Sequence, residues 1–405
     1  SIRRQRQMCI RDSAGHVRVY EYSNSGWTQL GSDIDGEGME NFSGWSVSMN
    51  SAGDRVAIGA DLNDDSGSEA GHVRVYEYSN SSWTQLGSDI DGEAAGDRSG
   101  WSVSMNSAGD RVAIGALFND GTASDAGHVR VYEYSNSSWS QLGSDIDGEA
   151  AGDRFGWLVS MNSAGDRVAI GAERNDGTAS DAGHVRVYEY SNSSWTQLGS
   201  DIDGEAADDR SGMSVSMNSA GDRVAIGATD NDGTASDAGH VRIYEYSNSS
   251  WSQLGIDIDG EAASDYSGNS VSMNSAGDRV AIGAPWNDGT ANTAGHVRVY
   301  SLTELFIDNR MMPTEFALHQ NYPNPFNPIT TLRYELPENG LVNITIYDMV
   351  GRQVKTLVNQ RQDAGYRSII WDATNDNGKP VSAGIYLYQI QAGGNMQTKK
   401  MVLLK

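Results

Sequence analysis

A block of 56 residues recurs along the first three quarters of this chain, and it limits the possible folds more than any other feature. The segment Ala-Gly-His-Val-Arg returns at this step, and a tryptophan follows each of its first five copies at a constant distance. The phrase Met-Asn-Ser-Ala-Gly-Asp-Arg-Val-Ala-Ile-Gly-Ala occurs five times, first at Met49. Near-identical copies at a fixed step indicate a repeat architecture, in which one supersecondary unit stacks on the next. The repeated residues are His16, His72, His128, His184, His240 and His296, with Trp27, Trp83, Trp139, Trp195 and Trp251.

Within one repeat, four short segments have the pattern of β-strands. Residues 45–49 alternate large and small side chains, which is the period of a strand. The segments 55–60, 72–78 and 83–90 are rich in Val, Ile, Tyr and Trp, and turn residues such as 50–54 separate them. Four strands with no helical segment are typical of a propeller blade. We therefore expect an all-β chain that begins with a β-propeller of four-stranded blades.

The number of repeats predicts an incomplete ring. Four complete repeats are preceded by the last two strands of one repeat and followed by the first three strands of another. Residues 1–12 match no repeat, and Met8–Asp12 resembles a translated sequencing adapter, so we interpret residues 1–12, with the only cysteine, as foreign to the protein. The propeller would then span residues 13–301.

The repeats resemble the FG-GAP units of integrin-α-like propellers. The resemblance rests on Phe155-Gly156, on the strand Val-Ala-Ile-Gly-Ala, and on the segment Gly-His-Val-Arg-Val-Tyr. Blades of that family often bind calcium between their first and second strands. Here Asn50–Asp54 occupies this place with a single carboxylate, whereas calcium takes six or more oxygen ligands. We expect no cofactor, and calcium binding is the one alternative that the sequence allows.

Composition changes after Tyr300, beyond which lie six of the seven prolines. Residues 302–315 form an expected linker, and Asn321–Pro328 cannot be helical because each proline fixes its own φ and restrains the residue before it. Six later segments have strand patterns, which favours a small C-terminal β-sandwich. These segments are residues 331–336, 342–348, 353–358, 367–372, 385–392 and 398–404.

Residues 316–405 closely resemble the C-terminal sorting domain of the type IX (Por) secretion system of Bacteroidetes-like bacteria, an Ig-like sandwich. The resemblance rests on Asn321–Pro328, Tyr347–Arg352, Gly384–Tyr388 and Lys399–Lys405. It implies export across the outer membrane, contact with the secretion machinery through residues 316–405, and a secreted or outer cell-surface location.

Charge and hydropathy exclude two classes of partner. The net charge is −25 at pH 7, and the first 300 residues carry 19 Lys and Arg against 45 Asp and Glu. Such an acidic surface repels nucleic acid and anionic membranes. No segment approaches the ~18 consecutive apolar residues of a membrane span. We therefore expect neither nucleic-acid binding nor membrane insertion.

Few residues suggest chemistry. Asp89, Asp91 and Glu93 could together bind one cation. A strand end, an Asp-Gly turn and a solvated link explain the same residues, and we favour this second interpretation. We expect the repeated histidines and tryptophans to be structural. No nucleophile elbow, phosphate loop or zinc motif is present, so we expect no catalytic residue.

One pattern does predict a binding surface. The turns after the first and third strands are nearly identical in all copies, whereas the loops at the opposite edge of each blade differ. Loops on a rigid scaffold are where binding sites usually lie. We interpret the varied edge as a ligand-binding rim, with drift at tolerant surface positions as the alternative. The varied residues are Leu62, Phe118, Arg174, Asp230 and Trp286 in one loop, and Trp45, Trp101, Trp157, Met213 and Asn269 at the start of the first strand.

Three functions follow from these features. The first is a non-catalytic binding or adhesion propeller that engages an extracellular protein or glycan. The second is the propeller appendage of a secreted hydrolase whose catalytic domain lies elsewhere. The third is a structural component of a surface layer.

Overall fold

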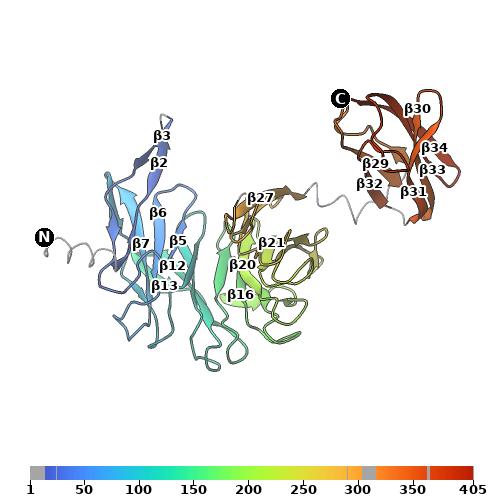
Figure 1. The fold of residues 1–405 in the computed structure, drawn as a ribbon. Coiled ribbons are helices and arrows are strands. Elements are labelled where there is room, and N and C mark those ends of the chain that lie inside the picture. The colour runs from blue at the N-terminus through green and yellow to red at the C-terminus, as the bar shows by residue number, and fades with distance from the viewer. Residues whose placement is uncertain (1–13, 24, 290, 303–315, 363–364, 405) are drawn as a thin grey trace. The chain divides into compact units, whose positions relative to one another are not determined.

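The computed structural model describes residues 14–23, 25–289, 291–302, 316–362 and 365–404. The chain forms two compact units, Ser1–Leu302 and Thr303–Lys405, and all their named elements are strands (Figure 1). The expected all-β class is thereby confirmed. The expected foreign segment 1–12, and the linker from residue 303 onward, lie outside the described residues. No helix in the described part of the chain is long and apolar enough to cross a membrane.

Each complete repeat forms one antiparallel sheet. In the first of them, β5 (Ser46–Met49), β6 (Arg55–Ala60), β7 (His72–Ser79) and β8 (Ser82–Gln85) follow one another across the sheet, and β9 (Ile90–Asp91) also pairs with β7. Three further sheets repeat this order. They consist of β10 (Ser102–Met105), β11 (Arg111–Ala116), β12 (His128–Ser135), β13 (Ser138–Gln141) and β14 (Ile146–Asp147); of β15 (Leu158–Met161), β16 (Arg167–Ala172), β17 (His184–Ser191), β18 (Ser194–Gln197) and β19 (Ile202–Asp203); and of β20 (Ser211–Met217), β21 (Arg223–Ala228), β22 (His240–Ser247), β23 (Ser250–Gln253) and β24 (Ile258–Asp259).

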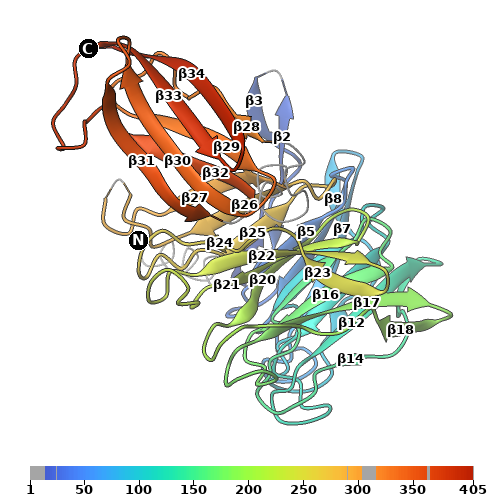
Figure 2. The same cartoon turned by 90° about the vertical axis from the view of Figure 1, so that its right-hand side faces the viewer.

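Partial repeats flank these four sheets, as the sequence predicts. The first contributes β1 (His16–Val17), β2 (Tyr20–Ser23), β3 (Gly26–Gln29) and β4 (Ile34–Asp35), and the last contributes β25 (Ser270–Met273), β26 (Arg279–Ala284) and β27 (His296–Ser301). Consecutive sheets follow one another through the first unit in the order of the chain, from blue to yellow in Figures 1 and 2. Sheets of this topology, stacked in sequence, form a β-propeller-like unit.

The expected fourth strand, residues 83–90, is split into β8 and β9. The break falls at Gly87, whose φ of +81° belongs to the left-handed region. An added Cβ at Gly87 would lie only 2.8 Å from the Trp139 side chain of the next repeat. The glycine therefore both ends the strand and leaves room for a neighbouring indole, a function that the strand pattern alone does not reveal.

The repeated tryptophans join consecutive sheets. The indole Nε1 of Trp139 donates a hydrogen bond of 2.7 Å to the carbonyl oxygen of Leu86 in the preceding repeat. The same bond links Trp83 to Leu30, Trp195 to Leu142, and Trp251 to Leu198. These four tryptophans are buried, which confirms the expected packing function for them, whereas Trp27 of the first partial repeat is 70% exposed.

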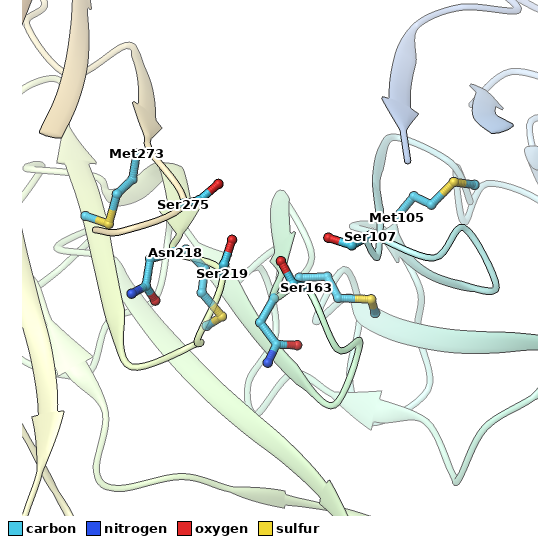
Figure 3. A pocket seen from close by; sticks show the side chains of 10 residues that line it. Met105, Ser107, Ser163, Asn218, Ser219, Met273 and Ser275 are labelled. Atoms are coloured by element: carbon cyan, nitrogen blue, oxygen red, sulfur yellow. The ribbon is translucent and has the colours of Figure 1, made fainter. Parts of the chain in front are cut away.

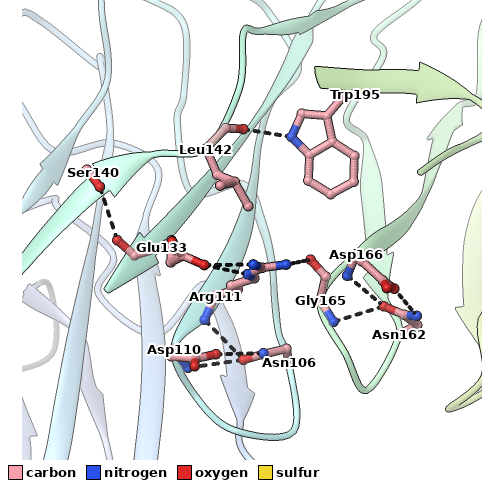
Figure 4. A network of polar contacts seen from close by, with 10 residues as sticks. All are labelled: Asn106, Asp110, Arg111, Glu133, Ser140, Leu142, Asn162, Gly165, Asp166 and Trp195. Atoms are coloured by element: carbon pink, nitrogen blue, oxygen red, sulfur yellow. Dashed lines mark hydrogen bonds and ion pairs between the residues drawn. The ribbon is translucent and has the colours of Figure 1, made fainter. Parts of the chain in front are cut away.

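A polar network reinforces each junction (Figure 4). Arg111 donates from Nε and Nη2 to the carboxylate of Glu133 in its own sheet, and from Nη1 to the carbonyl oxygen of Gly165 in the next repeat. In the turn, the Oδ1 atom of Asn106 accepts the backbone N–H groups of Asp110 and Arg111. The Asn106 side chain thus accepts hydrogen bonds from the backbone N–H groups of its own turn, while the Arg111 guanidinium bonds to the turn of the next repeat.

The C-terminal unit is a sandwich of two sheets. One consists of β28 (Ala317–Leu318), β29 (Thr330–Leu336) and β32 (Gly365–Trp371), and the other of β31 (Gln353–Gln362), β30 (Gly340–Asp348), β33 (Gly384–Ala392) and β34 (Asn395–Leu403). Its core includes Phe326, Leu332, Ile344, Trp371 and Tyr388. All six expected strands are present, and only the short β28 is missed.

The proline-rich run before β29 lies against the last strand of this sandwich. Phe326 exchanges backbone hydrogen bonds with Val402 and Leu404, and the Oδ1 atom of Asn324 accepts the N–H of Val402. The expected extended segment is therefore an integral part of the unit, because it holds the C-terminal end of the chain.

Candidate binding surface

The connections at one edge of each sheet are nearly identical among the repeats, whereas those at the opposite edge vary. Because the first four strands follow one another across the sheet, the turns after the first and third strands share one edge, and the other two connections share the opposite edge. We name the first edge the constant rim, formed by residues 50–54 and 79–82 and their equivalents. We name the second edge the variable rim, formed by residues 61–71 and 92–101 and their equivalents.

The constant rim is invariant for a structural reason. The N–H of Ser51 donates to the carbonyl oxygen of Ser107, that of Ser107 to Ser163, that of Ser163 to Ser219, and that of Ser219 to Ser275, at 3.1–3.2 Å. Figure 3 shows the serines of these turns along a small polar pocket of about 110 Å³. Each turn must therefore match both neighbours, so its constancy by itself does not argue for a function on the other rim.

On the variable rim, three predicted site residues form a row. The ring centroids of Trp45 and Trp101 are 4.9 Å apart, and those of Trp101 and Trp157 are 5.2 Å apart. Trp45 is 53% exposed, while the other two are half-buried. Met213, half-buried, and Asn269, exposed, occupy the equivalent positions of the next two repeats. The 56-residue step thus brings equivalent side chains together across repeats.

Phe118 lies between two arginines of the varied links, which were not among the predicted site residues. The guanidinium carbons of Arg98 and Arg154 are 5.4 Å and 5.2 Å from the centre of the Phe118 ring, within the range of cation–π contacts. Arg98 also forms an ion pair of 3.0 Å with Glu69. These arginines occupy a position in the link between repeats that holds phenylalanine or tyrosine in other copies. This variation among large side chains was the feature of the sequence that could have identified them.

A buried carboxylate organises the next part of the rim. Glu173 forms ion pairs of 3.3 Å with both Arg154 and Arg174, and Arg210 pairs with Asp230 at 3.2 Å. Burial raises the pKa of Glu173, and the three arginines oppose that rise. Burial also raises the pKa of Asp230. Arg174 and Asp230, both predicted site residues, are therefore fixed by charge pairs rather than free.

The last repeat provides a pocket on the same rim. Trp286 is 56% exposed, and its ring centroid lies 6.5 Å from that of Tyr266. Together with Ser264, Asp288 and Asn292 these residues line a pocket of about 440 Å³. A concave site lined by aromatic and polar side chains suits a small ligand or one residue of a larger one.

The first complete repeat differs from the others on this rim. Leu62 is half-buried, and its neighbour Asp61 is buried with an Oδ1 atom that has no hydrogen-bond partner. Burial raises the pKa of Asp61 to about 6, although Arg98 lowers it in part.

The acidic residues Asp89, Asp91 and Glu93 do not form a single group. Asp89 lies near the buried His72, whereas Glu93 lies near His128 of the next repeat, where it pairs with Arg130 at 3.0 Å. Asp91 faces His72 in the strand register, and burial raises its pKa. Buried histidines at equivalent positions are neutral near pH 7, because burial lowers the pKa values of His128, His184 and His240 to about 4.

Comparison with family models identifies the second unit. Residues 320–404 match the model described as the secretion system C-terminal sorting domain. The C-terminal unit is a type IX sorting domain. The protein is therefore secreted or displayed on the outer cell surface, and its sorting domain implies interaction with the type IX secretion machinery. The FG-GAP resemblance of the repeats stays a prediction.

Solved structures provide only distant likenesses. The chain is similar to a putative 6-phosphogluconolactonase from Bacteroides uniformis, at 9% identity over 87% of this chain and 94% of that one, with a TM-score of 0.47. It is also similar to PorZ, a surface component of the type-IX secretion system of Porphyromonas gingivalis, at 12% identity over 96% and 56%, with a TM-score of 0.41. The β-propeller domain of the Trilobed protease from Pyrococcus furiosus matches at 9% identity over 87% and 96%, with a TM-score of 0.38. At these values nothing about activity carries over, and a comparison with curated proteins finds no match.

Proposed function

We propose that this protein is an exported binding or adhesion propeller whose variable rim engages an extracellular protein or glycan without catalysis. The sorting domain directs the chain out of the cell, and the stacked sheets provide a rigid frame for a row of surface loops.

The observation that carries the proposal is the row of Trp45, Trp101 and Trp157. The row contains one exposed and two half-buried indoles, so it presents a stretch of aromatic surface that a partner could cover, and tryptophan and arginine are among the residues enriched at the centres of binding interfaces. The flanking contacts of Phe118 with Arg98 and Arg154 hold further rings and guanidinium groups in place before binding. A pre-organised surface loses less conformational entropy when it binds.

The test is binding of the purified chain to glycan and extracellular-protein arrays. We compare the unmodified protein with Trp101→Ala, Phe118→Ala and Trp286→Ala, and use Trp27→Ala as the matched control. Trp27 is 70% exposed in the same unit but lies on the hairpin of β2 and β3, away from the variable rim.

We expect the rim variants to weaken binding by more than about tenfold, since truncation of a central aromatic anchor commonly costs about 2 kcal/mol or more. The Trp27→Ala variant should bind as the unmodified protein does. Equal binding by all variants, or equal loss in the control, would overturn the proposal.

A further inference from the structure

We propose that Glu37, Asp65, His72 and Asp89 form a binding site for one divalent transition-metal ion, such as zinc. Each of the four side chains offers a ligand atom, and these atoms all lie within 4.8 Å of one another. The site is separate from the tryptophan row and independent of the proposed binding function.

The fold brings the four ligands together from two repeats. His72 begins β7, and Asp89 immediately precedes β9, which pairs with the start of β7. Asp65 lies in the loop between β6 and β7, where its N–H donates to the Oδ1 atom of Asn63 at 2.9 Å. Glu37 follows β4 of the preceding repeat. A bound ion would therefore link two neighbouring sheets.

The environment of the His72 imidazole indicates that it could bind a metal ion. His72 is 1% exposed, and its buried Nδ1 atom has no hydrogen-bond partner. This atom is 3.9 Å from the Oδ2 atom of Asp89, which is too far for a hydrogen bond. Two ligand atoms of a tetrahedral zinc ion lie about 3.4 Å apart, so side-chain rotations that shorten the separations in this cluster, which reach up to 4.8 Å, would bring the four atoms around one ion.

A hydrogen bond from a neighbouring residue orients the Asp89 carboxylate for metal binding. Gln85 donates from Nε2 to the Oδ1 atom of Asp89, which leaves Oδ2 toward His72. Hydrogen bonds of this kind, from a second shell of residues, orient the ligands of metal sites.

The charge of the cluster favours a dication. Glu37, Asp65 and Asp89 supply three carboxylates, and the one neighbouring cation with a direct ion pair is Arg74, at 2.9 Å from Glu37, among the described residues. Three carboxylates against one guanidinium leave an excess of negative charge. A mixed set of imidazole and carboxylate ligands suits zinc and similar transition metals, whereas calcium prefers oxygen ligands alone.

The other repeats supply a built-in comparison. Their groups contain only three candidate ligands, because a glycine replaces Asp65 in each of them. Where the first group has Asp65, the next has Gly121, and a Cβ added to Gly121 would lie 2.8 Å from the Oδ1 atom of Asn119 and 3.7 Å from the Oδ1 atom of Asp147. The three groups are Glu93, His128 and Asp145; Glu149, His184 and Asp201; and Glu205, His240 and Asp257.

The experiment titrates the untagged full chain, freed of metal with a chelator, with zinc chloride in a calorimeter, and follows cobalt binding by absorption spectroscopy. The variants are Asp65→Gly, His72→Gln and, as control, His128→Gln. Asp65→Gly introduces the residue that the other repeats carry at this position, so it should fold as they do, and far-UV circular dichroism checks this.

We expect one tight site in the unmodified chain, a loss of affinity of more than about tenfold in Asp65→Gly and in His72→Gln, and no change in His128→Gln. Gly121→Asp should create a second site of similar affinity. The proposal is overturned if the unmodified chain does not bind zinc, if both ligand variants bind it unchanged, or if calcium binds as tightly as zinc at the same residues.

Discussion

Replacing Trp139 by phenylalanine tests how one repeat holds the next. The indole of Trp139 is 9% exposed and donates its N–H to the carbonyl oxygen of Leu86 at 2.7 Å. Phenylalanine keeps an aromatic ring at this place but removes the donor.

The expected loss of stability comes from two sources. A carbonyl group deprived of its partner at a partly buried position costs about 1–3 kcal/mol. The smaller ring buries about 40 Å² less apolar surface, or about 1 kcal/mol at 25 cal/mol per Å². We therefore expect the free energy of unfolding of the first unit to fall by about 2–4 kcal/mol.

The chain contains its own control for this substitution. Trp27 occupies the equivalent position in the first partial repeat but is 70% exposed, so Trp27→Phe should change stability by less than about 0.5 kcal/mol. Urea unfolding followed by circular dichroism measures both variants. Equal effects at the two positions, or no effect at Trp139, would refute the view that these tryptophans join the sheets.

Three further predictions concern the turns, the histidines and the sorting domain. In hydrogen exchange, the amides of Ser107, Ser163 and Ser219 should exchange slowly because each donates to the next turn, while Ser275, at the end of this row within the described residues, should exchange faster; uniform fast exchange would argue against the row. Because the folded-state pKa values of His128, His184 and His240 are lowered to about 4 from the usual ~6.5, stability measured in EDTA should fall as the pH decreases from about 6.5 to about 4, and a variant with glutamine at all three positions should show a smaller decrease; equal pH profiles would contradict the assignment. Deleting residues 316–405 should keep the protein inside cells of a type IX host, as cell fractionation and immunoblotting would show, and export of the truncated chain would contradict the function of this domain.

Much of the fold could be predicted because local patterns determine it. Residues 55–60 are rich in strand-forming residues and are bounded by turn residues, and β6 has these same bounds. The split of the fourth strand could not be read in the same way, because it depends on Gly87 meeting an indole from another repeat. The pattern of a strand depends on its own residues, so it does not reveal a contact with Trp139, 52 residues further along the chain.

The candidate surface was predicted in outline. The variation among repeats pointed to positions such as Trp101 and Phe118, which do lie beside equivalent or neighbouring rim residues. The flanking Arg98 and Arg154 were not among the predicted site residues, because variation among the links does not show which side chain they contact. The four-residue cluster around His72 was missed for a related reason, since its fourth ligand, Asp65, occurs in one copy and averaging over copies hides it.

Whether equivalent residues of consecutive repeats meet on one rim is measured most directly by the exciton coupling of tryptophans in circular dichroism. Rings about 5 Å apart and tilted by 47–50° couple strongly, and Trp101 belongs to both pairs of the row. We expect that subtracting the spectrum of Trp101→Phe from that of the unmodified chain leaves a couplet with one positive and one negative band. A difference spectrum with only the single weak band of an isolated indole would contradict it.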